Sequence, residues 1–162
     1  MTVTYGDGYQ PALLGWCIEQ HGRYYCQEWG FGLFFETKVA MDMAGFLRRL
    51  SSPRSHLLWA RNDDQFLATL ALDPGSAESG LLHLRWFITA DGARGKGIGH
   101  HLMNTAISHA TEEGAKGLFL NTFEGLDAAQ QLYEKFGFRL INQHHDTTWG
   151  VEVKEQRFEL RF

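Results

Sequence analysis

The chain has 162 residues, of which 44% are hydrophobic and 14% aromatic, enough for one domain with a sizeable core. Its formal net charge of −4 argues against a nucleic-acid-binding protein, which usually carries a basic face. It contains no apolar run of about 18 residues, no signal-peptide pattern and no zinc-type cysteine spacing. We therefore expect a single domain over residues 1–162, cytoplasmic, monomeric or homodimeric, without nucleic-acid or membrane partners.

The first third of the chain predicts a strand followed by two helices. Residues 9–14 suit an edge strand because Pro11 cannot donate to a central ladder, and residues 15–28 suit a first helix. A second helix is expected to end before Ser51-Ser52-Pro53. Its apolar positions keep helical spacing: Phe35, Val39, Met43, Phe46, Leu47 and Leu50.

Two strands are predicted next, over residues 55–61 and 65–73, joined by a hairpin turn at Asn62-Asp63-Asp64. The four residues Asp73-Pro74-Gly75-Ser76 indicate another turn before the central strand. In that strand, over residues 82–88, apolar side chains alternate, which places four of them on one face: Leu82, Leu84, Trp86 and Ile88.

A glycine-rich loop, Ala93-Arg94-Gly95-Lys96-Gly97-Ile98-Gly99, follows the central strand and opens a helix. The helix is predicted from an apolar stripe at every fourth residue: Ile98, Leu102, Ala106 and Ala110. Glycine lets an anion approach the backbone closely, and the first N–H groups of a helix lack partners within it. The loop is therefore a candidate phosphate-binding site, although a glycine-rich turn can also serve only to pack strand and helix.

The spacing in this loop excludes a Walker A motif and a dinucleotide fingerprint. Instead, Arg94-x-x-Gly97-x-Gly99 resembles the Arg/Gln-x-x-Gly-x-Gly/Ala loop of the GNAT N-acetyltransferase superfamily. A second GNAT block, Ala-x-x-Leu-Tyr-x-x-x-Gly-Phe, is matched in the right order by Ala129, Leu132, Tyr133, Gly137 and Phe138.

The resemblance implies an α/β (α+β) fold with a mixed, mostly antiparallel sheet of about seven strands flanked by about four helices. The expected order is β-α-α-β-β-β-α-β-α-β-β, with a strand at residues 117–123, a helix from Asp127 that stops at Gly137, and two strands over residues 138–143 and 155–162. Strings such as Leu84-Arg85-Trp86-Phe87-Ile88 are similar to GNAT domains often fused to MarR-type regulators, here without the regulator.

The resemblance also implies acetyl-CoA as the acetyl donor and no metal. The loop would hold the diphosphate through Arg94, Gly95, Lys96, Gly97, Ile98 and Gly99. The end of the central strand, Phe87-Ile88-Thr89, would pair with the pantetheine arm, and a backbone N–H there, that of Ile88, would serve the thioester oxyanion. Asn121 is a candidate for a further pantetheine contact or simply a polar strand end.

Tyr133 is the predicted general acid, because a protonated phenol can return a proton to the leaving thiolate. Its alternative role is packing beside Leu132 and Phe136. Many relatives carry asparagine seven residues before this tyrosine, where Leu126 stands here, so an asparagine contact to coenzyme A is in doubt.

The general base is left open between His83, the carboxylates Glu28 and Glu36, and water. Glu28 lies in the same helical segment as Glu36, and Arg85 lies in the same strand as His83. Each of these charged side chains also fits a role as a solvated surface residue. The aromatic residues from Tyr24 to Phe35 fit an acceptor pocket or the core. His144-His145-Asp146 is interpreted as a solvated turn rather than a metal site, and His100 and His101 as groups near a phosphate or in water.

These observations predict an N-acetyltransferase that transfers acetyl from acetyl-CoA to a primary amine of a small molecule, amino acid or peptide. The expected mechanism is direct attack in a ternary complex, since neither Cys17 nor Cys26 lies in a motif. The alternatives are a non-catalytic acyl-CoA-binding module and a nucleotide hydrolase, the latter disfavoured by the missing Walker lysine.

Overall fold

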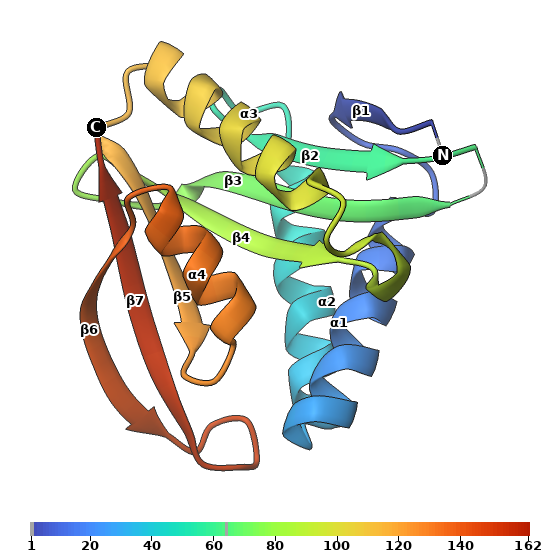
Figure 1. Ribbon diagram of the computed structural model, residues 1–162, viewed down its shortest axis with the longest axis vertical. Helices are drawn as coiled ribbons and strands as arrows, with labels where there is room; N and C mark the ends of the chain where they lie inside the picture. Colours follow the sequence, from blue (N-terminus) through green and yellow to red (C-terminus); the bar gives the residue numbers. More distant parts are fainter. Residues whose placement is uncertain (1, 64) are drawn as a thin grey trace.

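The computed structural model describes residues 2–63 and 65–162, which form one seven-stranded sheet flanked by four α-helices (Figure 1). The order matches the predicted one, with an added 3-10 turn at Asp91–Ala93, so the predicted fold class is confirmed. The elements are β1 (Thr4–Asp7), α1 (Leu13–Trp29), α2 (Leu33–Arg48), β2 (His56–Arg61), β3 (Phe66–Glu78), β4 (Leu81–Thr89), α3 (Ile98–Glu112), β5 (Gly117–Phe123), α4 (Asp127–Lys135), β6 (Arg139–Asp146) and β7 (Val153–Arg161).

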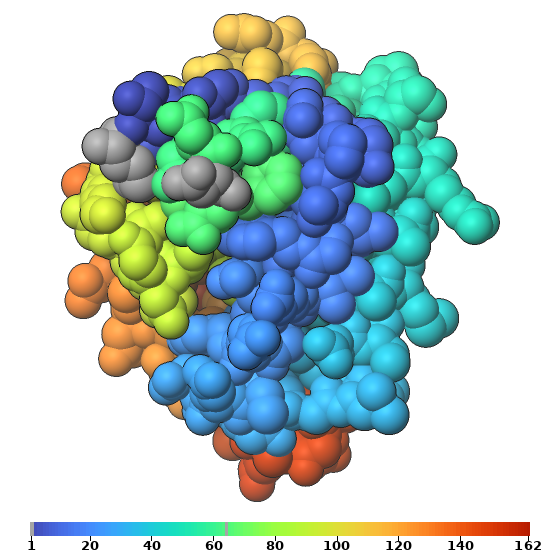
Figure 2. All heavy atoms as spheres, turned by 90° about the vertical axis from the view of Figure 1, so that its right-hand side faces the viewer, coloured from blue at the N-terminus to red at the C-terminus, as the bar shows by residue number. Residues whose placement is uncertain are grey.

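The strands lie in the order β1-β2-β3-β4-β5-β7-β6, and every neighbouring pair is antiparallel except β4 and β5. Helices α3 and α4 pack on one face, where Leu102, Ala106 and Tyr133 join the core. Helices α1 and α2 pack on the other face, through residues such as Met43 and Phe46. Figure 2 views the molecule from the right-hand side of Figure 1, with α1 and α2 in blue and cyan and the segment before α3 in yellow-green beside α1.

Strands β4 and β5 pair only at their beginnings, where Leu81–His83 faces Gly117–Phe119. Beyond that point β4 carries a bulge: Ala71 pairs with Arg85 and Thr69 with Ile88, so three steps along β4 match two along β3. Trp86, within the bulge, has a left-handed φ of 48°. The alternation predicted for this strand is therefore wrong at Trp86, which packs on the α1–α2 face while Leu82 and Leu84 pack on the α3 face.

Two predicted elements differ from the structure. The first strand is β1 at Thr4–Asp7, whereas residues 9–12 form no strand and lead into α1. The predicted turn at residues 73–76 does not end its strand, because β3 continues to Glu78. There the register shifts between Asp73 and Glu78, and the Asp73 carboxylate accepts hydrogen bonds from Gly75 N and Ser76 Oγ. Turn-type residues thus form a bulge, and the chain reverses at Ser79 and Gly80.

The other predicted boundaries agree with the structure to within a few residues. The β2–β3 hairpin is closed by Asn62, whose Oδ1 accepts from Gln65 N at 2.8 Å; Asp64 of the predicted turn lies outside the described residues. Gly137 follows α4 with a left-handed φ of 96°, as its predicted helix-stop role requires. Within the described residues, no helix is long and apolar enough to cross a membrane.

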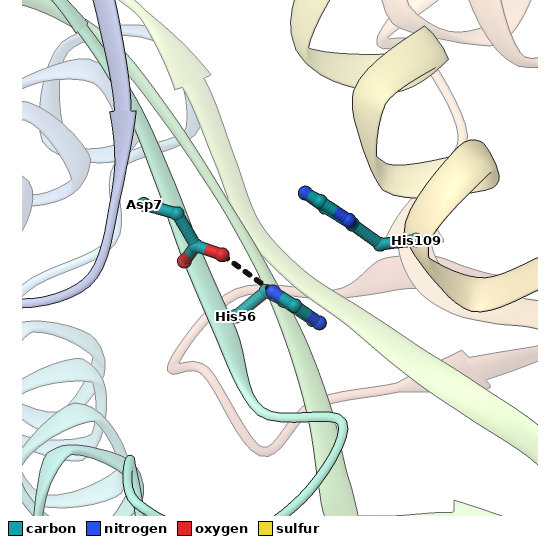
Figure 3. A group of neighbouring side chains, drawn as sticks. All are labelled: Asp7, His56 and His109. Carbon is teal, nitrogen blue, oxygen red and sulfur yellow. Dashed lines mark hydrogen bonds and ion pairs between the residues drawn. The ribbon is translucent and has the colours of Figure 1, made fainter. Parts of the chain in front are cut away.

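A cluster of titratable side chains joins β1, β2 and the end of α3 (Figure 3). His56 Nδ1 lies 2.5 Å from Asp7 Oδ2, and its Nε2 lies 2.7 Å from Glu113 Oε1. The His109 ring stacks on the His56 ring at 4.4 Å. The hydrogen bond to Asp7, aided by Glu113, raises the pKa of His56 above its ordinary value despite the opposing effect of burial. This side chain is therefore a charged link between the sheet edge and α3.

We expect His56→Gln to lower the free energy of unfolding by about 1 to 3 kcal/mol near about pH 6, where two charge-assisted hydrogen bonds are lost. Because the folded pKa of His56 is raised, its contribution is full below the unfolded pKa and is lost as pH rises through the folded value. The difference between variant and wild type should shrink toward about pH 9 in urea unfolding. His145→Gln, which removes only an exposed pair with Glu152, is the control; a pH-independent deficit in His56→Gln would contradict the charged link.

Candidate active site

A cavity of about 860 Å³ lies between the diverging strands β4 and β5. Its walls include Tyr25 and Phe35 from the α1–α2 face, and Ile98 and Tyr133 from the α3–α4 face. The divergence of the two strands therefore joins both faces of the sheet through one opening.

The glycine-rich loop forms the α3-side end of this cavity. Gly95 and Gly97 have left-handed φ values of 74° and 77°, and a Cβ on either would meet no atom within 4 Å. Gly97 precedes α3, which has no side-chain cap, so the first helical N–H groups are open to an anion. Of the loop residues predicted to hold a diphosphate, Arg94, Gly95, Gly97, Ile98 and Gly99 line the cavity, whereas the exposed Lys96 does not.

Arg94 and Gly99 explain why the loop holds this shape. The Arg94 guanidinium donates to Thr89 O at 3.3 Å, pairs with Asp91 at 3.0 Å and lies over the Tyr24 ring. A Cβ on Gly99 would approach Phe87 Cζ to 3.1 Å, so a larger residue would press on β4. The motif residues therefore tie loop, strand and α1 together around the candidate phosphate site.

The end of β4 presents its free edge to the cavity, which Phe87, Ile88 and Thr89 all line. Ala90 N donates to Leu67 O, and Thr69 pairs with Ile88, so the antiparallel alternation directs the Ile88 N–H toward β3 and the Thr89 N–H away from it, toward β5. The oxyanion role of Ile88 stays a prediction.

Tyr133 reaches the cavity from α4 and is 6% exposed. Its ring packs against Phe87, Phe138 and Phe158. Burial raises the pKa of Tyr133 well above its ordinary value, so the phenol keeps its proton throughout the physiological range. The ring packing weighed for this side chain is present, and its role as the general acid stays a prediction.

His83 lines the cavity but is poorly suited to be a base. Its Nδ1 lies 2.8 Å from Ser76 Oγ, and its ring stacks on Phe119 at 4.3 Å. Burial, followed by the positive charge of Arg85, lowers the pKa of His83 to about 3. Such an imidazole is neutral at pH 7 but too weakly basic to take a proton readily from an ammonium.

The remaining predicted site residues fall in different places. Asn121, at the exposed end of β5, lines the cavity. Glu36 does not line it: the residue is exposed on α2, and its carboxylate lies over Gly22 of α1, where an added Cβ would meet Oε1 at 2.5 Å. Glu28 lies in a separate pocket of about 360 Å³ beside Thr89 and Arg94. The structure thus gives no support to Glu36 as the base.

Comparison with known proteins agrees with this geometry. Residues 13–138 match the family model described as the acetyltransferase (GNAT) family. The chain belongs to the GNAT family. An uncharacterised N-acetyltransferase of Schizosaccharomyces pombe is 26% identical over 122 residues, which is 75% of this chain and 74% of that protein.

Two solved structures show the same fold over nearly the whole GNAT chain. An N-acetyltransferase from Staphylococcus aureus Mu50 superposes with a TM-score of 0.80 at 13% identity, covering 99% of each chain. The Salmonella typhimurium protein yncA, determined with its cofactor acetyl-CoA, superposes with a TM-score of 0.73 at 14% identity and covers 99% of this chain and 94% of its own.

The α1–α2 side of the GNAT cavity contains residues that the sequence analysis missed. Phe123, Trp149, Asp42 and Glu155 all line it. The indole Nε1 of Trp149 is buried and has no hydrogen-bond partner in the described part of the chain. Asp42 is already paired with Lys38 at 2.7 Å and with Arg85 at 3.3 Å. These residues come from α2, β5, the β6–β7 loop and β7, and no local sequence pattern links them.

The interpretation of residues 144–146 as a turn is wrong, because they lie in β6. His144 and Asp146 share a face with Glu155 of β7, and the three groups hold ligand-type atoms within 4.8 Å of one another. His145 points to the opposite face and pairs with Glu152 at 3.3 Å.

Of the two histidines that follow the glycine-rich loop, His100 lines the cavity, whereas His101 stacks on Tyr5.

Proposed function

We propose that residues 1–162 act as one GNAT domain that transfers the acetyl group of acetyl-CoA to a primary amine by direct attack in a ternary complex. The observation that carries this proposal is the cavity through the sheet. The glycine-rich loop and Tyr133 line the cavity on its α3–α4 side. The part of the cavity on the α1–α2 side, lined by residues such as Tyr25 and Phe35, is the proposed acceptor compartment. Donor and acceptor can then meet at the free edge of β4, which satisfies the proximity that acyl transfer needs.

A covalent acyl-enzyme route would have no cysteine nucleophile among the described residues that line this cavity. Cys17 is fully buried, burial raises the pKa of its thiol to about 11, and its Sγ contacts Thr69 Oγ1. Cys26 is exposed, and neither cysteine is among the residues that line the cavity. Since a thiolate is the reactive form of cysteine, direct transfer is the route that this site supports.

The acceptor compartment favours an amine attached to an apolar group. Its lining is rich in aromatic rings, which offer apolar surface, and it includes the Glu155 carboxylate, which pairs with His144 and not with Lys or Arg among the described residues. The ring residues are Tyr25, Phe35, Trp86, Phe123 and Trp149. We take an arylalkylamine or an aromatic amino-acid amide as the acceptor class to test first.

The test is a calorimetric titration with acetyl-CoA, with ATP and NAD as controls, followed by thiol release in the presence of a panel of primary amines. Selective binding of acetyl-CoA and amine-dependent thiol release are the expected results. Binding without thiol release across the panel would instead favour a non-catalytic acyl-CoA-binding module. No binding by the folded protein would remove the acetyltransferase proposal.

A further inference from the structure

Glu155 lies on β7, the strand beyond β5, and its side chain lines the cavity. On β7 it pairs with Phe123 of β5, and directly opposite residues in a sheet point to the same face. Phe123 packs on the α1–α2 face, so the Glu155 carboxylate lies on the acceptor side, where it lines the cavity. Phe87, Ile88 and Thr89 of β4, the strand segment that would hold the thioester, line the same cavity. Glu155 and that segment therefore border one cavity from two different strands.

We propose that Glu155 is the general base that removes a proton from the acceptor ammonium, directly or through one water molecule, in the acetyl transfer proposed above. The assignment rests on that proposed function and on the placement of this carboxylate in the acceptor compartment. Other titratable groups that line the cavity are less suitable or lie elsewhere: His83 and His21 are weakly basic, and Asp42 is paired with Lys38 and Arg85. Asp127 lines the cavity from the start of α4, on the side of Tyr133.

Two side chains of β6 surround the Glu155 carboxylate. His144 Nε2 lies 3.2 Å from Glu155 Oε2, and Asp146 shares a hydrogen bond with the same carboxyl. Burial and the neighbouring Asp146 raise the pKa of Glu155, while His144 acts in the opposite direction. A carboxylate that is more basic than usual is better suited to accept a proton near neutral pH. Lys154, the adjacent residue on β7, is paired with Glu124 instead.

The proposed step balances as follows. The ammonium R–NH3⁺ gives one proton to the Glu155 carboxylate, and the neutral amine attacks the thioester carbonyl carbon as a C–N bond forms. The tetrahedral intermediate collapses with cleavage of the C–S bond, and its nitrogen loses a second proton. The leaving thiolate takes a proton from Tyr133, and the second proton lost by the nitrogen restores the Tyr133 phenol. The products are the N-acetyl amide, the free thiol of coenzyme A and one proton released to solvent from Glu155.

The test compares wild type, Glu155→Gln and Glu152→Gln. Glu152 is the matched control because it is exposed, lies three residues away and does not line the cavity. Each protein is assayed by thiol release with phenethylamine, benzylamine and phenylalanine amide, and with hydroxylamine. The last nucleophile is already unprotonated near neutral pH and needs no base before attack. Binding of acetyl-CoA is measured by calorimetry in parallel.

We expect Glu155→Gln to lower the rate with the best amine by about 100-fold or more at about pH 7. The deficit should shrink as pH rises toward the pKa of the amine, because solvent then deprotonates it. The rate of transfer to hydroxylamine and the dissociation constant for acetyl-CoA should each change by less than about threefold. That change is small beside the rate acceleration that a general base supplies. Glu152→Gln should behave as wild type throughout.

Several results would overturn the assignment. Full amine activity in Glu155→Gln would exclude the base role, and an equal loss with amines and hydroxylamine would mark the residue as packing or positioning. Wild-type transfer to hydroxylamine but to no amine would also overturn it, since no ammonium would then be deprotonated. Failure of the wild type with every nucleophile would instead remove the proposed function itself.

Discussion

Replacing Gly97 with glutamate is expected to weaken acetyl-CoA binding by about 100-fold or more, which corresponds to about 2.7 kcal/mol. The residue has a φ of 77° and precedes the first turn of α3, and a Cβ would project into open space at the loop. A glutamate there would place a carboxylate where the diphosphate is expected and would also strain the left-handed backbone. Calorimetric titration of the variant with acetyl-CoA measures the effect.

Gly114→Glu is the matched control for this variant. Gly114 has a φ of 79°, a Cβ on it would also meet no atom within 4 Å, and it lies past the opposite end of α3. The two substitutions impose similar backbone strain, so a loss of binding in Gly97→Glu alone is attributable to the loop. If both variants bound acetyl-CoA like the wild type, the loop would be only a turn between β4 and α3.

Replacing Tyr133 with phenylalanine is expected to lower kcat by about 100- to 1000-fold while the dissociation constant for acetyl-CoA stays nearly unchanged. The substitution keeps the ring packed against Phe87, Phe138 and Phe158 and removes only the hydroxyl. Thiol-release kinetics at saturating amine, together with calorimetry, separate the loss of a proton donor from the loss of binding.

The pH dependence gives a second check on the role of Tyr133. Burial raises the pKa of its phenol, so the group stays protonated and the deficit of Tyr133→Phe should be constant from about pH 6 to about pH 9. Tyr9→Phe, which removes the hydroxyl of a side chain that is 61% exposed, is the control. Weaker acetyl-CoA binding in proportion to the loss of rate would show that Tyr133 acts through packing.

Much of this fold depends on local patterns that one sequence displays. The stripe from Ile98 to Ala110 predicted α3 because one buried face requires that spacing, and Gly137 predicted the end of α4 because a left-handed φ favours glycine. The loop residues Gly95 and Gly97 are recognisable for the same reason. The family could therefore be predicted from two short blocks, the glycine-rich loop and the block that ends at Gly137, whose backbone conformation depends on neighbouring residues in the sequence.

The positions that local patterns could not predict are those set by pairing between distant strands. Trp86 faces the α1–α2 core only because β4 bulges against β3, and Asp73–Ser76 bulges inside a strand although its residues favour a turn. The predicted boundaries of β1 failed because four residues at a sheet edge carry little apolar pattern.

The candidate site divides in the same way. The sequence by itself determined the GNAT order of elements, the glycine-rich loop and the tyrosine of α4, because each depends on backbone conformation within a few residues. Only the tertiary structure decided the acceptor side, where it placed Glu36 outside the cavity and Glu155 of β7 among the residues that line it. That placement follows from strand register and from the divergence of β4 and β5, which arise from contacts between residues far apart in the chain.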